Sequence, residues 1–137
     1  MPPIVLDASI ALAWAFKDEQ NAEAERIVRL IRYQRGLVPL IWHLEIANVL
    51  VMAERRGCLN LSDTQMILAD LKILPIDVDP VGSFTGVSAA VFAASRRYNL
   101  SIYDATYLEL AQRHNLPLAT GDRKLREAAY QAGVALA

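Results

Sequence analysis

The stretch IVLDASIALAWAF, residues 4–16, decides how the fold begins. Its first three residues predict a short buried strand, and the apolar run further on predicts a helix that follows without a linker and ends near Lys17. Asp7 lies between these two elements. An ionised carboxylate is costly to bury unless it is hydrogen-bonded, paired with a cation or bound to a metal. The role of Asp7 is therefore the first question that the sequence raises.

The composition is typical of one globular domain over residues 1–137, since 54% of the residues are hydrophobic and 21% are charged. The net charge of −1 provides no overall attraction for nucleic acid or an anionic membrane, so a polyanion would need a local site. Cys58 is the only cysteine, the N-terminus lacks a basic region, and no apolar run approaches the ~18 residues of a membrane span. These features favour a cytoplasmic protein that does not associate with membranes.

Short apolar segments alternate with helical patterns along the rest of the chain. Further strands are predicted at residues 37–40, 75–78 and 118–120, with 134–136 as a candidate fifth. Helices are predicted over residues 21–34, 44–56, 62–72, 87–98, 104–114 and 123–131. This alternation predicts an α/β three-layer sandwich, with a small parallel sheet of about four to five strands flanked by helices.

Local signals set the ends of several of these helices. Ser62 and Gln65 form a capping-box pattern at the start of one helix, and Asp104 is the predicted cap of another. Gly36 and Gly57 are the predicted stops of two more. The helix over 21–34 has its apolar face at Ala24, Ile27, Val28 and Ile31.

Acidic residues follow the predicted strands, which is where ligands bind in open α/β sheets. Asp7 follows the first strand, Glu45 comes shortly after the second, Asp104 follows residues 102–103, and Asp122 follows the strand at 118–120. Taken singly, each acid has a local explanation. Asp7 and Asp104 suit helix caps, Asp122 suits a turn or cap, and Glu45 suits a first-turn acid that matches the helix dipole.

The helix that carries Glu45 weakens its local explanation. Apolar residues cover nearly the whole circumference of this helix, which predicts that it is buried on all sides. Glu45 and Asn48, three residues apart, share its one polar stripe. A buried carboxylate beside an amide indicates a site rather than a solvated face.

Four carboxylates in one crevice would repel one another, at roughly 4 kcal/mol for a pair about 4 Å apart at an effective dielectric near 20. Apart from Arg123 and Lys124 beside Asp122, no basic residue accompanies these acids in the sequence. All-oxygen clusters suit Mg²⁺ or Mn²⁺, ions that can activate water in phosphodiester cleavage. Ser9 and Thr120 offer hydroxyls that could hold a water, position an acid or cap the backbone locally.

Other chemistries fit less well. The segment HLE at residues 43–45 suggests a zinc deaminase, but such a site needs a Cys-x-x-Cys pair. A phosphoaspartate phosphatase would carry a second acid two residues after Asp7, and no glycine-rich phosphate loop is present. A Ser-His-Asp triad stays open on residue counts, although His43 and His114 lie in no recognisable nucleophile context.

Four segments together resemble the PIN-domain proteins of the VapC-like toxin family over nearly the full chain: IVLDASIALAW, HLEIANVL, LSIYDATYLELAQRHNLPLATGDRKLREAA and the closing GV. The resemblance implies that the sandwich has the PIN-like fold. It implies that the activity is that of a Mg²⁺- or Mn²⁺-dependent endoribonuclease. It also implies the toxin of a type II toxin–antitoxin module, which forms a homodimer and is neutralised by a cognate antitoxin.

The resemblance carries over to particular residues. It implies that Asp7, Glu45, Asp104 and Asp122 are the catalytic, metal-binding acids, that Asn48 accompanies Glu45, and that Ser9 and Thr120 line the site. Some relatives carry an additional acid close to the last one, whereas Gly121 and Arg123 flank Asp122 here.

The RNA-binding surface and two rival functions stay open. Arg123, Lys124 and Arg126 lie beside Asp122 and are the candidates for phosphate contacts. The rival functions are a non-catalytic binding module of the same fold and a metal-dependent phosphodiesterase that acts on DNA or a small phosphate ester.

Overall fold

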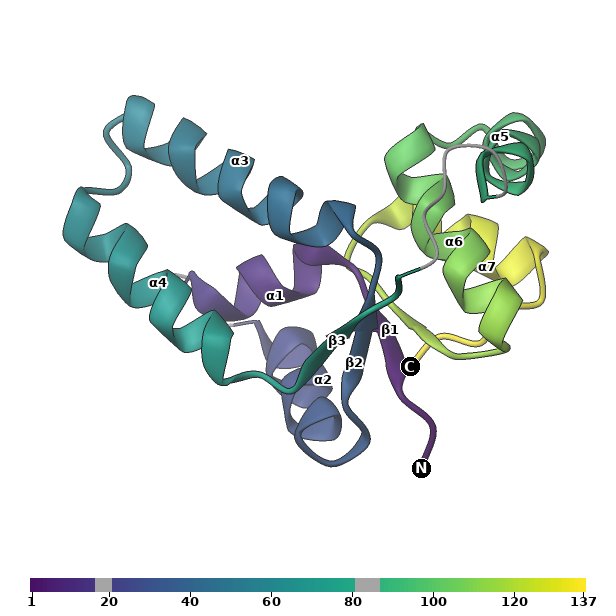
Figure 1. Ribbon diagram of the computed structural model, residues 1–137, viewed down its shortest axis with the longest axis horizontal. Helices are drawn as coiled ribbons and strands as arrows, with labels where there is room; N and C mark the ends of the chain where they lie inside the picture. Colours follow the sequence, from purple (N-terminus) through teal and green to yellow (C-terminus); the bar gives the residue numbers. More distant parts are fainter. Residues whose placement is uncertain (17–20, 81–86) are drawn as a thin grey trace.

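The computed structural model describes residues 1–16, 21–80 and 87–137. A four-stranded parallel sheet in the order β3-β2-β1-β4 lies at its centre (Figure 1). Its strands are β1 (Ile4–Leu6), β2 (Gly36–Val38), β3 (Ile76–Val78) and β4 (Leu118–Ala119). The predicted α/β sandwich with about four to five strands is confirmed. The candidate fifth strand amounts to an isolated bridge between Leu118 and Leu136.

Helices flank the sheet on both sides, with α1 to α4 on the left of Figure 1 and α5 to α7 on the right. The helices of the described residues are α1 (Ala8–Ala15), α2 (Ala22–Gln34), α3 (Ile41–Arg55), α4 (Leu61–Ile73), α5 (Val87–Tyr98), α6 (Ile102–His114) and α7 (Arg123–Gln131). Lys17, near which the first helix was predicted to end, lies outside the described residues. None of the helices in this part of the chain is long and apolar enough to cross a membrane.

Helix α2 forms as its pattern predicts, but its stop is different. The side chain of Asn21 caps it by accepting a hydrogen bond from the backbone N–H of Ala24, and the four predicted apolar residues are buried. Arg35, with φ of 69°, ends the helix, and Gly36 is the first residue of β2. Gly36 suits that place because a Cβ there would lie 2.8 Å from Cδ1 of Ile76 on the neighbouring strand.

Two helix starts also differ from the prediction. Helix α3 begins at Ile41 rather than Leu44, immediately after a turn in which the N–H of Trp42 donates to the carbonyl of Pro39. The capping box of α4 consists of Asn60 and Asp63, whose side chains each accept from the other's backbone N–H. The prediction of Ser62 as the cap is wrong because Asn60 supplies the same interaction two residues earlier.

The core lies on both faces of the sheet, and β1 is its most enclosed strand. Ile4, Val5 and Leu6 are all buried because β1 lies between β2 and β4 and is covered by helices on both sides. Ile27 of α2 and Leu108 of α6 are fully buried as well. This packing fixes the carboxyl ends of β1 and β4 beside each other, and the candidate site is built there.

We expect Ile27→Ala to lower the free energy of unfolding by about 2–5 kcal/mol, because it leaves a cavity in a fully buried part of the core. Urea denaturation followed by circular dichroism would measure the change. Arg29→Ala, at an exposed position of the same helix, is the matched control and should stay within about 0.5 kcal/mol of the wild type. Equal effects of the two substitutions would contradict the described packing of α2.

Candidate active site

Asp7 lies at the carboxyl end of β1, next to the turn that follows β4. Its backbone N–H donates to the carbonyl of Ala119, which continues the pairing of the two strands. The carboxylate is buried, with 5% of the residue exposed. The position is the N-cap of α1, but the side chain makes no capping hydrogen bond. The helix-cap explanation of this carboxylate is therefore wrong.

Two hydroxyls hold the Asp7 carboxylate from either side. Ser9 Oγ donates to Oδ2 of Asp7 at 2.7 Å, and Thr120 Oγ1 donates to the same oxygen at 2.6 Å. Each hydroxyl also accepts a backbone N–H of the turn after β4, Ser9 from Gly121 and Thr120 from Asp122. Ser9 and Thr120 therefore connect the acid after the first strand to the segment that carries the last acid.

Asp104 reaches the site from the first turn of α6. The cap of this helix is Ser101, whose Oγ accepts the backbone N–H of Asp104 at 3.1 Å. The prediction that Asp104 caps the helix is wrong, because residues 102–103 are already helical rather than extended. The carboxyl group of Asp104 is consequently not used as a cap.

Glu45 comes from the second turn of α3, so the first-turn explanation is also wrong. Its Oε1 accepts a hydrogen bond of 2.6 Å from the hydroxyl of Tyr107, which is fully buried in α6. Tyr107 lies three residues after Asp104, and this spacing places the two on one side of the helix. Tyr107 was not among the predicted site residues, although it lies within the motif around Asp104.

Asp122 does behave as a helix cap. Its Oδ1 accepts the backbone N–H of Leu125 at 2.9 Å at the start of α7. Its negative charge nevertheless raises the pKa of Asp7 and of Asp104. Capping and a place in the site coexist because a carboxylate has two oxygens that can accept.

Burial and mutual repulsion raise the pKa of three of the acids. Burial has the largest effect on Asp7, on Glu45 and on Asp104, whose pKa rises to about 6. Neighbouring carboxylates contribute in each case, Asp7 and Asp104 acting on Glu45 for example. Lys124 partly offsets the rise for Asp104. We call these three residues and Asp122 the acid cluster.

Within the described residues, the acid cluster makes no direct ion pair with a basic side chain. No ion pair found in residues 1–16, 21–80 and 87–137 joins any of its members to an arginine or lysine. Asp79, which follows β3 at the same edge of the sheet, is the contrasting case. It is buried and pairs at 2.6 Å with Arg113, which also binds Glu109 of α6 at 2.8 Å. Because Asp79 directly follows a strand, the sequence could have indicated it as a further candidate site residue. Its ion pair with Arg113 sets it apart from the acid cluster.

The carboxylate oxygens of the acid cluster are the ligand type that a hard divalent cation prefers. The side chains are not already arranged around a single ion position. Within the described residues, no group of three or more Asp, Glu, His or Cys side chains lies close enough to hold a metal ion together. Mg²⁺ is commonly bound through one or two carboxylates and keeps several waters, so such a group is not required. The uncompensated charge and the raised pKa values are the observations that favour a cation here.

The prediction that the helix carrying Glu45 is buried on all sides is wrong for α3. Only Trp42, Ile46 and Leu50 are buried, whereas Leu44 is 71% exposed and Val51 is 42% exposed. Figure 1 shows the reason, since much of α3 extends beyond the sheet and has α1 and α4 on one side only. The other side forms a wall of an open groove.

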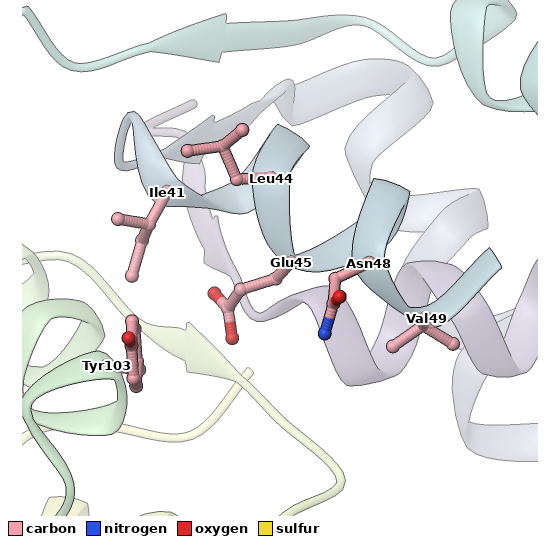
Figure 2. Close-up of a pocket in the computed structure, with 6 residues that line it drawn as sticks. All are labelled: Ile41, Leu44, Glu45, Asn48, Val49 and Tyr103. Carbon is pink, nitrogen blue, oxygen red and sulfur yellow. The ribbon is translucent and has the colours of Figure 1, made fainter. Parts of the chain in front are cut away.

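This groove, which we call the α3–α6 groove, adjoins the acid cluster through Glu45 (Figure 2). Its volume is about 460 Å³, and its lining residues are Ile41, Leu44, Glu45, Asn48, Val49 and Tyr103. The predicted neighbour of Glu45, Asn48, is exposed in this groove rather than buried.

The basic residues after Asp122 lie at the surface. Arg123 and Lys124 are exposed, and Arg123 lies 3.6 Å from Glu127 in its own helix. Arg126 donates to the carbonyl of Thr120 at 3.1 Å. The structure thus places these cations beside the last acid, and their contact with phosphate remains a prediction.

The structure is thus an α/β domain whose candidate site consists of carboxylates. The chain belongs to the PIN domain family, which matches residues 4–130. It is 34% identical over 124 residues to Ribonuclease VapC9 of Mycobacterium tuberculosis, covering 90% of this chain and 89% of that protein. It is 30% identical over 128 residues to Ribonuclease VapC3 of Pyrobaculum aerophilum, covering 90% and 92%.

Solved structures share the fold. A crystal structure from Pyrobaculum aerophilum covers 93% of this chain and 84% of its own, with a TM-score of 0.71 and 20% identity. A toxin–antitoxin complex from Klebsiella pneumoniae covers 87% and 86%, with a TM-score of 0.58 and 22% identity. These likenesses confirm the predicted PIN-like sandwich.

We expect Asp104→Asn to stabilise the metal-free protein at pH 7.5. The folded protein holds the Asp104 carboxyl with a raised pKa of about 6, whereas the unfolded chain ionises it near 3.8. The group therefore lowers the free energy of unfolding as pH rises from about 4 to 6, and the loss persists above 6. Solvent screening limits the gain on substitution to the order of 1 kcal/mol.

Thermal unfolding in excess chelator at pH 7.5 and pH 4 would measure this gain, which should nearly vanish at the lower pH. Asp77→Asn is the matched control. The partner Arg35 lowers the pKa of Asp77, so removing that charge should not stabilise the protein at pH 7.5. An unchanged or lower melting temperature for Asp104→Asn would contradict the described electrostatics.

We expect Tyr107→Phe to raise the pKa of Glu45 further, because the lost hydroxyl donates to the ionised carboxylate and lowers that pKa. Carbon-13 NMR titration of the glutamate carboxyl groups would follow the change. Tyr103→Phe, which removes a hydroxyl from an exposed ring, is the control and should leave the pKa of Glu45 unchanged. No shift in the Tyr107 variant would show that this hydrogen bond does not act on Glu45.

Proposed function

We propose that this protein is a Mg²⁺- or Mn²⁺-dependent endoribonuclease that hydrolyses RNA phosphodiester bonds. The observation that carries the proposal is the acid cluster at one edge of the sheet. Burial and neighbouring charges raise the pKa of Asp7, Glu45 and Asp104, and no ion pair within the described residues joins the cluster to an arginine or lysine. A set of carboxylates that repel one another is suited to an ion of opposite charge. The names of the relatives, VapC ribonucleases, support RNA as the substrate.

The residues proposed to hold the ion are Asp7, Glu45, Asp104 and Asp122. When bound, the cation would lower the pKa of a water and compensate the charge on the phosphate oxygens. The chain's own part is to orient the acids without cancelling their charge. Ser9 and Thr120 hold one oxygen of Asp7, and the Tyr107 hydroxyl holds one oxygen of Glu45.

The phosphate of the substrate would approach from the exposed side of Asp122. Arg123 and Lys124 are proposed to contact phosphates there, and exposed cations next to an acidic site can position an RNA strand without reading its sequence. Asn48 is proposed to assist from the other side of the cluster, one turn along α3 from Glu45.

We further propose that the enzyme acts in the cytoplasm as the toxin of a toxin–antitoxin pair, as a homodimer neutralised by a small cognate antitoxin. The names of the curated relatives and the likeness to the complex from Klebsiella pneumoniae support this role. Expression of the chain alone should arrest growth of the host, and co-expression of the protein encoded beside it should restore growth.

The decisive experiment measures cleavage of single-stranded RNA by the purified chain with Mn²⁺. Asp7→Asn should lower the rate by at least about 100-fold, since even residues that support metal ligands commonly cost 10- to 100-fold. Excess chelator should abolish cleavage. Asp77→Asn, the same substitution in a surface ion pair with Arg35, should leave the rate unchanged.

Three results would overturn the proposal. Full activity of Asp7→Asn or in excess chelator would exclude the proposed site. Equal cleavage of DNA or of a small phosphate diester would indicate a general phosphodiesterase. Absence of cleavage together with absence of Mn²⁺ binding by calorimetry would indicate a binding module.

A further inference from the structure

We propose that the α3–α6 groove holds one unpaired nucleobase of the RNA strand whose phosphodiester lies at the acid cluster. The inference rests on the proposed function and adds to it a substrate subsite that includes Tyr103. The groove is large enough for such a ligand, because its volume of about 460 Å³ falls within the range of small-molecule sites.

The walls of the groove match the two faces of a base. Tyr103 is 60% exposed, so an aromatic ring is available at the start of α6. Ile41 and Leu44 of α3 are aliphatic lining residues, and Ile41 lies on the side of Tyr103 (Figure 2). Exposed aromatic rings beside a nucleic-acid path are stacking platforms, since every base has a π-face. An aromatic and an aliphatic wall together suit a flat ligand.

The polar groups of the groove suit the edge of a base rather than a phosphate. Asn48 presents an amide, which both donates and accepts hydrogen bonds as base edges do. Among the described residues, Glu45 is the only charged one that lines the groove, and its carboxylate points toward the side where Tyr103 lies (Figure 2). The described lining therefore carries a negative charge and no basic side chain, which disfavours a phosphate and admits a neutral base.

The groove lies next to the acid cluster, so its occupant belongs to the nucleotide whose phosphodiester reacts. Tyr103 directly precedes Asp104 in the chain, and Glu45 belongs both to the groove and to the acid cluster. A group seated in the groove is therefore adjacent to a group seated at the acids. In a nucleotide, the base and the phosphate are such neighbours, joined through the ribose.

A base in this groove must be free of its pairing partner. The walls belong to two helices, and a base held between them exposes neither face to a neighbouring base pair. Recognition of RNA by stacking on side chains is typical of single strands, loops and ends. The subsite therefore requires that the base next to the reacting phosphodiester is unpaired.

The test compares steady-state cleavage by full-length variants of a single-stranded oligoribonucleotide that contains every dinucleotide step, and of its duplex. We expect Tyr103→Ala to raise KM about 10-fold or more on the single strand with kcat little changed, because stacking contributes to binding. Tyr103→Phe should retain the wild-type KM, since its ring still stacks. The wild type should cleave the duplex poorly.

Tyr33→Ala is the control, because Tyr33 is an exposed tyrosine on α2 that does not line the groove, and its substitution should leave KM unchanged. Mn²⁺ binding by calorimetry should be the same in Tyr103→Ala and the wild type, which separates a base subsite from damage to the acids.

Distinct results would overturn the inference. If the wild type cleaves the single strand and both Tyr103→Ala and Tyr33→Ala keep its KM, the base subsite is refuted and the proposed function stands. If Tyr103→Ala then also escaped neutralisation by the co-expressed antitoxin, the groove would be assigned to a protein segment. Equal cleavage of single strand and duplex would refute the unpaired base. A wild type inert on all RNA would remove the proposed function itself.

Discussion

The hydrogen bonding of one buried carboxylate organises this end of the molecule. Oδ2 of Asp7 accepts from Ser9 and from Thr120, and the two hydroxyls accept in turn from backbone N–H groups of the turn after β4. The start of the first helix and the start of the last are thereby fixed to each other across the sheet edge. Removing the oxygen that accepts from both hydroxyls would loosen the two segments together, although Asp7 and Thr120 lie 113 residues apart in the sequence.

Neutral donors orient the acids that are left without cations, and arginines pair with acids elsewhere. Hydroxyls hold Asp7 and Glu45, and a backbone N–H holds Asp122. Asp77 and Asp79, by contrast, each pair with an arginine. A neutral donor fixes the direction of a carboxylate and leaves most of its charge in place. Whether a carboxylate is held by a neutral donor or by an arginine therefore distinguishes the candidate site residues from the structural acids more clearly than burial does.

The sequence predicted the sheet, most helices and the acids to inspect, because strand and helix periodicities and the carboxyl-edge rule are local or topological signals. It did not predict the cap at Ser101 or the start of α3 at Ile41, because several polar residues compete for a helix end and contacts decide among them. The exposure of Leu44 was missed for a different reason. Periodicity shows that a helix is apolar, whereas only the packing shows how much of it has a neighbour.

The ion network around Arg113 bears on how the site can adjust. Arg113, near the C-terminal end of α6, joins Asp79 of the sheet edge and Glu109 one turn back, so this half of the helix is anchored. The first turn of α6 carries Tyr103 and Asp104. Tyr107, which is fully buried one turn after Asp104 and hydrogen-bonded to Glu45, holds the other half of the helix. Tyr103 and Asp104 belong to the same turn, so the position of this turn sets the place of the acid and of the tyrosine together.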